Sequence, residues 1–259
     1  TALAMGVLLS VSAADMATAD MATLTRQAQS GDVAAQLDLA DEYYKRGNHA
    51  KAFEWTTKAA NQGFADAQFG LGVLYHNGHG VSQDYQKAVE WITKAANQGH
   101  AAAQTNLGLM YEQGKGVRQD YQKAFEWTTK AANQGYADAQ NNLGVMYDNG
   151  QGVRQDYQKA VEWYTKAAHQ GDAGAQYNLG GMYAKGHGVS QDYQKAFEWT
   201  TKAANQGFAD AQFNLALMYV NGHGVRQNKS TAKRYFGQAC DNGYQSGCDH
   251  YRILNEQGY

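Results

Sequence analysis

The sequence predicts an all-α protein built as a solenoid of two-helix repeats. The chain has 259 residues, and its five tryptophans are spaced 36 residues apart. An interval of this length is typical of repeat architectures, in which each unit buries its apolar face against its neighbours. The chain contains 29 glycines and no proline, a composition that favours helices joined by short glycine turns. The residues that keep the interval are Trp55, Trp91, Trp127, Trp163 and Trp199; Gly63, Gly99, Gly135, Gly171, Gly207 and Gly243; and Gln68, Gln104, Gln140, Gln176 and Gln212.

Each interior repeat is expected to hold two antiparallel helices, helix A and helix B. In residues 65–99, apolar residues recur at helical spacing until Gly78, where a residue without Cβ can take the left-handed conformation that ends helix A. Asp84 is the expected N-cap of helix B, which runs to Gly99. The apolar stripes comprise Ala67, Leu71, Leu74 and Tyr75 in helix A, and Tyr85, Ala88, Val89, Ile92, Ala95 and Ala96 in helix B.

Helix B also carries a glutamate followed four residues later by a lysine in five repeats. Such pairs stabilise an exposed helix face by roughly 0.2–0.5 kcal/mol each, so we expect five surface ion pairs without a chemical role. The pairs are Glu54/Lys58, Glu90/Lys94, Glu126/Lys130, Glu162/Lys166 and Glu198/Lys202.

Six repeats are predicted, and the terminal two depart from the common pattern. The first lacks the G-x-G-V insertion between its helices, and the sixth has Tyr235 in place of tryptophan. Atypical terminal repeats are expected, because an outermost helix must tolerate water on a face that inner copies bury. The predicted repeats are 32–63, 64–99, 100–135, 136–171, 172–207 and 208–243, followed by a capping helix in 244–259.

Residues 1–19 are interpreted as a secretory signal peptide. Residues 1–13 are uncharged and mostly apolar, and cleavage after Ala13, Ala14 or Ala19 fits the small residues that follow. The apolar run is too short to span a bilayer, so we expect a periplasmic or secreted protein without a stable membrane anchor. The alternative is that this run is a first amphipathic helix of the solenoid.

Two cysteines, Cys240 and Cys248, are predicted to lie at the end of one helix B and the start of the next helix A. These positions are neighbours across a short turn, and an exported chain meets oxidising conditions. We therefore expect a disulfide, and the alternative is a pair of buried free thiols.

Composition and charge exclude two broad classes. An apolar content of 43% excludes a disordered chain. A net charge of −2 with an isoelectric point near 6.4 gives no basic field for nucleic acid, so nucleic acids are not expected partners.

The repeat reads A-x-A-Q-x-x-L-G-x-M/L-Y-x-x-G-x-G-V-x-x-D-Y-x-K-A-x-E-W-x-x-K-A-A-x-Q-G, and four interior copies carry nearly every position. In this pattern residues 32–243 resemble the Sel-one-like repeat family, a close relative of the tetratricopeptide repeats. The resemblance implies a right-handed α/α superhelix and an adaptor or scaffold role through protein–protein contacts. Cysteine-rich secreted members of the family also pair cysteines across helix junctions with seven residues between them.

The resemblance further implies that helix A lines a concave face, and the copies differ most at positions that face this way. A protein or peptide partner is expected here, with Phe69, Tyr177 and Phe213 as aromatic anchors. The alternative is sequence drift at solvated positions. We call this set the helix-A row: Asp66, Phe69, Val73, His76, Thr105, Leu109, Glu112, Asp138, Asn141, Val145, Asp148, Tyr177, Asp210, Phe213 and Leu217.

No metal, cofactor or catalytic site is predicted. His76 and His79 have an H-x-x-H spacing, but no further ligand set completes a tetrahedral shell. The G-x-G turns follow a helix end, whereas phosphate-binding loops precede a helix N-terminus. No serine lies in a nucleophile elbow.

The predicted function is therefore a non-catalytic scaffold that binds a protein or peptide. One alternative is a β-lactam-binding or β-lactamase-like enzyme, as suggested for cysteine-rich relatives, although the chain does not carry the set of S-x-x-K, S-D-N and K-T-G motifs. Another is a structural spacer without a partner.

Overall fold

The computed structural model describes residues 21–259, and every regular element in this range is an α-helix. The predicted all-α class is therefore confirmed. The signal peptide predicted in residues 1–19 lies outside the described residues. The helices are α1 Met21–Gln29, α2 Val33–Lys45, α3 His49–Asn61, α4 Ala65–Asn77, α5 Tyr85–Asn97, α6 Ala101–Gln113, α7 Tyr121–Asn133, α8 Ala137–Asn149, α9 Tyr157–His169, α10 Ala173–Lys185, α11 Tyr193–Asn205, α12 Ala209–Asn221, α13 Lys229–Asp241 and α14 Gln245–Glu256.

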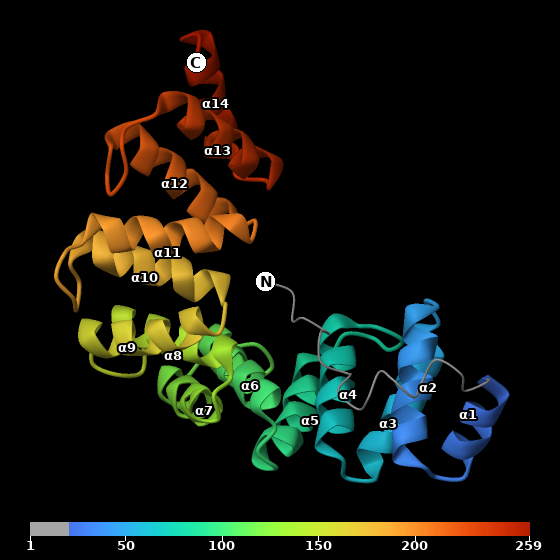
Figure 1. Ribbon diagram of the computed structural model, residues 1–259. Coiled ribbons are helices and arrows are strands. Elements are labelled where there is room, and N and C mark those ends of the chain that lie inside the picture. The colour runs from blue at the N-terminus through green and yellow to red at the C-terminus, as the bar shows by residue number, and fades with distance from the viewer. Residues whose placement is uncertain (1–20) are drawn as a thin grey trace. The chain divides into compact units, whose positions relative to one another are not determined.

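The chain forms two compact units, of which the first ends at Gln134 and the second comprises Gly135–Tyr259. Within each unit, successive helices lie side by side in chain order (Figure 1). Each helix A, such as α4 or α10, packs more extensively on the following helix B than on the preceding one. This alternation of intra-repeat and inter-repeat contacts is that of an α/α solenoid.

The predicted helix boundaries in residues 65–99 are confirmed. Helix α4 ends at Gly78, which adopts a left-handed φ of 71° and donates its N–H to the carbonyl of Leu74. Helix α5 starts after Asp84, whose carboxylate accepts the N–H of Lys87 at 2.9 Å. The backbone N–H of Asp84 also bonds the carbonyl of Tyr75 at 2.9 Å, which ties the end of helix A to the start of helix B.

Helix α1 was not predicted from the sequence. It occupies the place of a helix B before the first repeat, because Gln36 of α2 donates to the carbonyl of Ala28 at 3.0 Å. The equivalent glutamine of the next repeat, Gln68, bonds the carbonyl of Ala60 in helix α3. The chain therefore begins its described part with a shortened helix B that covers α2.

The tryptophans pack between repeats, but the lysines beside them do not behave as expected. Trp91 packs against a cluster that includes Ala60 of the preceding repeat and Leu71 of its own repeat. Among residues 21–259, only Glu54 and Lys58 of the five predicted Glu–Lys pairs come within ion-pair distance, at 2.7 Å. In all five repeats the lysine ammonium lies 3.7–4.0 Å from the indole centroid three residues before it, and in the four without an ion pair this cation–π contact takes its place. The covered pairs are Lys58/Trp55, Lys94/Trp91, Lys130/Trp127, Lys166/Trp163 and Lys202/Trp199.

In five of the six repeats, a buried amide joins helix A to the helix B on either side of it. Gln176 of α10 is only 5% exposed, and its Nε2 donates to the carbonyl of Ala168 in the preceding helix B at 3.1 Å. Its Oε1 accepts from Nε2 of Gln206, just after α11, at 2.9 Å. Gln206 donates as well to the carbonyl of Gly171 at 2.9 Å. We call this arrangement the amide ladder; its glutamine–amide pairs are Gln36/Gln62, Gln68/Gln98, Gln104/Gln134, Gln140/Gln170, Gln176/Gln206 and Gln212/Asn242.

The G-x-G loops also contact the preceding repeat. A Cβ on Gly188 would lie 2.3 Å from the carbonyl oxygen of Tyr157, so only glycine allows this loop to approach the start of α9. The residue between the glycines, His187, stacks on Tyr157 with ring centroids 4.5 Å apart. His223 stacks in the same way on Tyr193 one repeat later, at 4.5 Å.

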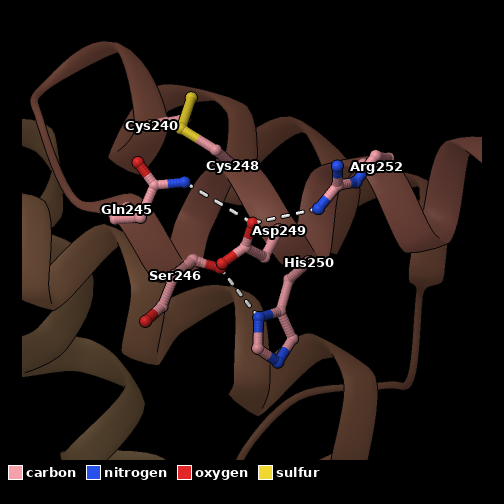
Figure 2. Close-up of polar contacts among 7 residues, drawn as sticks. All are labelled: Cys240, Gln245, Ser246, Cys248, Asp249, His250 and Arg252. Atoms are coloured by element: carbon pink, nitrogen blue, oxygen red, sulfur yellow. Dashed lines mark hydrogen bonds and ion pairs between the residues drawn. A yellow bond between two sulfur atoms is a disulfide. The ribbon is translucent and has the colours of Figure 1, made fainter.

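The C-terminal helix is fastened to α13 by a disulfide. Cys240 in the last turn of α13 and Cys248 in α14 are bonded, with Cα atoms 4.6 Å apart, as predicted (Figure 2). Helix α14 also buries Leu254 against a cluster that contains Phe236 and Ala232 of α13.

We expect Gln176→Ala to lower the free energy of unfolding by about 1–3 kcal/mol, because the carbonyl of Ala168 and the amide of Gln206 lose a buried partner. Urea unfolding followed by circular dichroism measures the change. The control is Gln158→Ala on the exposed face of α9, which should stay within about 0.5 kcal/mol of the wild type. Equal stability of the two variants would show that the amide ladder is energetically neutral.

We expect Cys240→Ser combined with Cys248→Ser to lower stability by about 2–3 kcal/mol, because the bond closes a short loop in the unfolded chain. Hydrogen exchange should increase first in residues 244–259, since α14 ends the stack and packs mainly on α13. Unchanged exchange in this segment would contradict a role of the disulfide in holding α14.

Candidate functional site

The helix-A row is largely covered in the first unit. Phe69 is 3% exposed, and its ring centroid lies 4.8 Å from that of His100. Val73, His76 and Thr105 are also buried, and the Thr105 hydroxyl donates to the carbonyl of Ala101 at 2.9 Å. The row members that stay half-buried or exposed here are Asp66, Leu109 and Glu112.

In the first unit, the Glu112 carboxyl and the His100 imidazole have pKa values shifted from their ordinary values. Glu112 is half-buried, and desolvation raises the pKa of its carboxyl. Asp66 is 68% exposed at its side chain and accepts from Nε2 of His100 at 3.1 Å. Nδ1 of His100 accepts the N–H of Ala103 at 3.0 Å, so His100 is both the N-cap of α6 and a donor to Asp66. Burial lowers the pKa of His100 more than Asp66 raises it.

In the second unit every member of the helix-A row remains half-buried or exposed. Phe213 packs within an aromatic cluster, with ring centroids 4.9 Å from Tyr244 and 5.1 Å from His250 of α14. Tyr177 lies 5.4 Å from Phe208 and keeps its hydroxyl in a hydrogen bond. Of the three proposed aromatic anchors, Tyr177 is therefore the one with both open surface and a polar group. The remaining members are Asp138, Asn141, Val145, Asp148, Asp210 and Leu217.

Hydrogen bonds connect row members of the second unit to asparagines that sequence reasoning did not select. Asn178 Nδ2 donates to Asn141 Oδ1 at 3.0 Å, and Asn214 Nδ2 donates to the Tyr177 hydroxyl at 3.1 Å. A signal was present in the sequence, because an asparagine precedes the Leu of the repeat at the constant interval. The repeat pattern left this position unassigned; its asparagines are Asn106, Asn142, Asn178 and Asn214.

The described residues bring together no recognisable catalytic group. Ser246, Asp249 and His250 lie on α14, but His250 Nδ1 bonds the backbone carbonyl of Ser246 at 2.8 Å, not its hydroxyl (Figure 2). Asp249 accepts from Arg252 at 3.1 Å, and the contact from Gln245 is 3.5 Å. These are helix-surface contacts between residues three or four positions apart.

One member of the serine-enzyme motif set is present after all. Ser230 and Lys233 form an S-x-x-K sequence at the start of α13. Lys233 Nζ contacts the backbone oxygen of Tyr259 and lies 5.4 Å from the Tyr251 ring centroid. The lysine is therefore engaged with the C-terminal segment and not with Ser230.

Residues 21–259 contain neither a metal-binding cluster nor a membrane-spanning helix. No group of three or more His, Cys, Asp or Glu residues in this range is placed to hold a metal ion. No helix in this range has the length and apolar character needed to cross a membrane.

The repeats match a known family along most of the chain. A family model described as the Sel1 repeat matches six consecutive segments, each beginning one residue later than the repeat counted from the sequence. The protein belongs to the Sel1 repeat family. The matched segments are 33–64, 65–100, 101–136, 137–172, 173–208 and 209–244.

Solved structures agree with this assignment. A protective antigen of uropathogenic Escherichia coli strains with an SLR fold is 38% identical, with a TM-score of 0.85, over 93% of this chain and 52% of that one. A Sel1 repeat protein from Oxalobacter formigenes is 37% identical, with a TM-score of 0.81, over 90% of this chain and 69% of that one. The chain thus spans about half the length of the Escherichia coli antigen. An immunity protein from Pseudomonas aeruginosa shares the fold at 23% identity, with a TM-score of 0.54, over 78% of this chain and 81% of that one. No curated protein sequence matches the chain.

We expect the Sel1 repeat stack to lose stability as the pH falls from about 7.5 to about 5, and His100→Asn to reduce this loss. Because the pKa of His100 is lowered in the folded state, the unfolded chain takes up the proton first below about pH 6.5 and is favoured. Asparagine keeps a capping acceptor for Ala103 without titrating. Urea unfolding of both proteins at the two pH values measures the difference, and an identical loss in both would exclude His100 as its source.

Proposed function

We propose that this protein is an exported, non-catalytic scaffold that binds a protein partner through the helix-A row. Sel1 repeats generally mediate protein–protein interactions. The helical packing recurs from repeat to repeat, whereas the helix-A row varies, and this contrast supports the proposal. The amide ladder recurs in six copies, while the row in the second unit changes from Asn141 to Tyr177 to Phe213 without loss of the helical frame.

The surface chemistry of the row supports a protein partner. It combines apolar and aromatic groups, such as Leu217 and Tyr177, with polar groups that are half-buried and so already partly desolvated. Contact surfaces of this mixed type supply both anchors and orientation. In the family, helix A is expected to line the concave side of the stack, where several copies can contact one partner together.

Export is supported by the disulfide between Cys240 and Cys248, because such bonds persist in oxidising compartments. The uncharged apolar run in residues 1–13 supports it independently, as the expected apolar region of a signal peptide. We propose a periplasmic or extracellular location on these two grounds.

We expect Tyr177→Ala combined with Leu217→Ala to reduce partner capture about 30-fold, because truncation of anchor side chains typically costs about 2 kcal/mol or more. Full-length tagged protein is incubated with envelope and culture fractions of the producing organism, and captured proteins are quantified by mass spectrometry. The control is Lys166→Ala combined with Lys202→Ala, which changes two exposed lysines of α9 and α11. Capture that survives the first change and is lost with the second would place recognition on helix B.

A further inference from the structure

Two side-chain couples cross from one repeat to the next in the second unit. The Asn178 amide of α10 donates to Asn141 Oδ1 of α8 at 3.0 Å. The Asn214 amide of α12 donates to the Tyr177 hydroxyl of α10 at 3.1 Å. The two couples therefore lie one after the other along the helix-A row, and their members are all half-buried.

Each couple keeps at least one donor and one acceptor free. An asparagine carries two N–H groups and a carbonyl oxygen, and a tyrosine hydroxyl both donates and accepts. Asn178 Oδ1 and Asn141 Nδ2 are left over from the first couple, and Asn214 Oδ1 and the Tyr177 O–H from the second. Among residues 21–259 no other hydrogen bond engages these four groups.

Helix α10 leaves space beside both couples. A Cβ on Gly181 would meet no atom within 4 Å, whereas the same repeat position holds Val145 in α8 and Leu217 in α12. A Cβ on Gly174 would come 3.2 Å from Asn141 Nδ2, so the glycine keeps that amide uncovered. At residue 181 α10 therefore carries less side-chain bulk than α8 and α12 do at the equivalent positions.

On the basis of the proposed function, we propose that the second unit binds an extended, basic polypeptide segment. The Asn141/Asn178 and Tyr177/Asn214 couples bond the main chain of this segment, and one of its side chains lies over Gly181. An extended chain offers an N–H and a C=O at each residue and advances about 3.3 Å per residue. Main-chain bonds supply affinity, and the open space over Gly181 supplies selectivity.

The charge beside the couples favours a basic segment over an acidic one. Asp138, Asp172 and Asp210 mark the starts of α8, α10 and α12, and Asp138 is exposed. Burial raises the pKa of Asp172, and the nearby charge of Asp138 raises it further, so the carboxylates here repel one another. A lysine or arginine of the bound segment would relieve this repulsion, whereas an acidic segment would add to it.

The test selects a phage-displayed library of random linear 12-residue peptides on the immobilised full-length protein. The enriched peptide is synthesised, and its Kd is measured by fluorescence anisotropy. We expect an excess of lysine and arginine, and a Kd about tenfold weaker for Asn178→Leu and for Gly181→Leu. Gly181→Leu is expected to fold, because leucine occupies the equivalent positions 109 and 217 and favours a helix more than glycine does. The matched control, Asn106→Leu, changes the equivalent asparagine of the first unit and should leave the Kd unchanged.

A second measurement leaves the protein intact. Methylation of single backbone nitrogens of the peptide should weaken binding about three- to tenfold at the bonded positions and not at the positions between them. Failure to enrich any peptide, or a Kd unaffected by Asn178→Leu, Gly181→Leu and backbone methylation, would overturn the inference. Binding that is lost instead with Leu109→Ala would overturn it while supporting the proposed role of the helix-A row. Enriched peptides insensitive to every change in the row would count against both.

Discussion

The fold depends on a buried side-chain amide that satisfies backbone groups at the junction of three helices. In five of the six repeats this glutamine donates to a carbonyl at the end of the preceding helix B, and in all six it accepts from the residue that follows its own helix B. Carbonyls at a helix end lack the full set of intrahelical partners. The carbonyl of Ala168 already accepts the N–H of Gly171 at 3.1 Å, and the amide gives it a second hydrogen bond while the other face of helix A stays free to vary.

Much of this frame could be predicted from the sequence, because local signals decide it. The glycine after helix A and the aspartate before helix B set the ends of α4 and α5 at Gly78 and Asp84. Helix α1 was missed because its only signals are a short apolar pattern and Gly31, and its identity as a shortened helix B depends on the long-range bond from Gln36 to Ala28. The lysines of helix B were assigned to glutamates because helical spacing allows that contact, yet spacing cannot tell whether an indole three residues away competes for the same ammonium.

The candidate site was less predictable, because it depends on contacts across repeats. Variation between copies located the row, but it could not show that Phe213 belongs to an aromatic cluster with α14 or that Tyr177 shares its hydroxyl with Asn214. Asn178 was overlooked for the opposite reason, since asparagine holds this position in four consecutive copies and so did not stand out among the variable ones. A recurrent residue can serve recognition when its partner in the next helix is one of the variable ones.

The stacking of two successive G-x-G loops on the tyrosine at the start of an earlier helix has an evolutionary consequence. His187 meets Tyr157 and His223 meets Tyr193 through the same positions, 30 residues apart in both cases. Duplicating one 36-residue repeat in the gene would therefore create a junction between repeats with the same contacts as those already present. Unequal recombination can lengthen or shorten such a protein in single steps, and the number of copies becomes a heritable variable that selection can adjust.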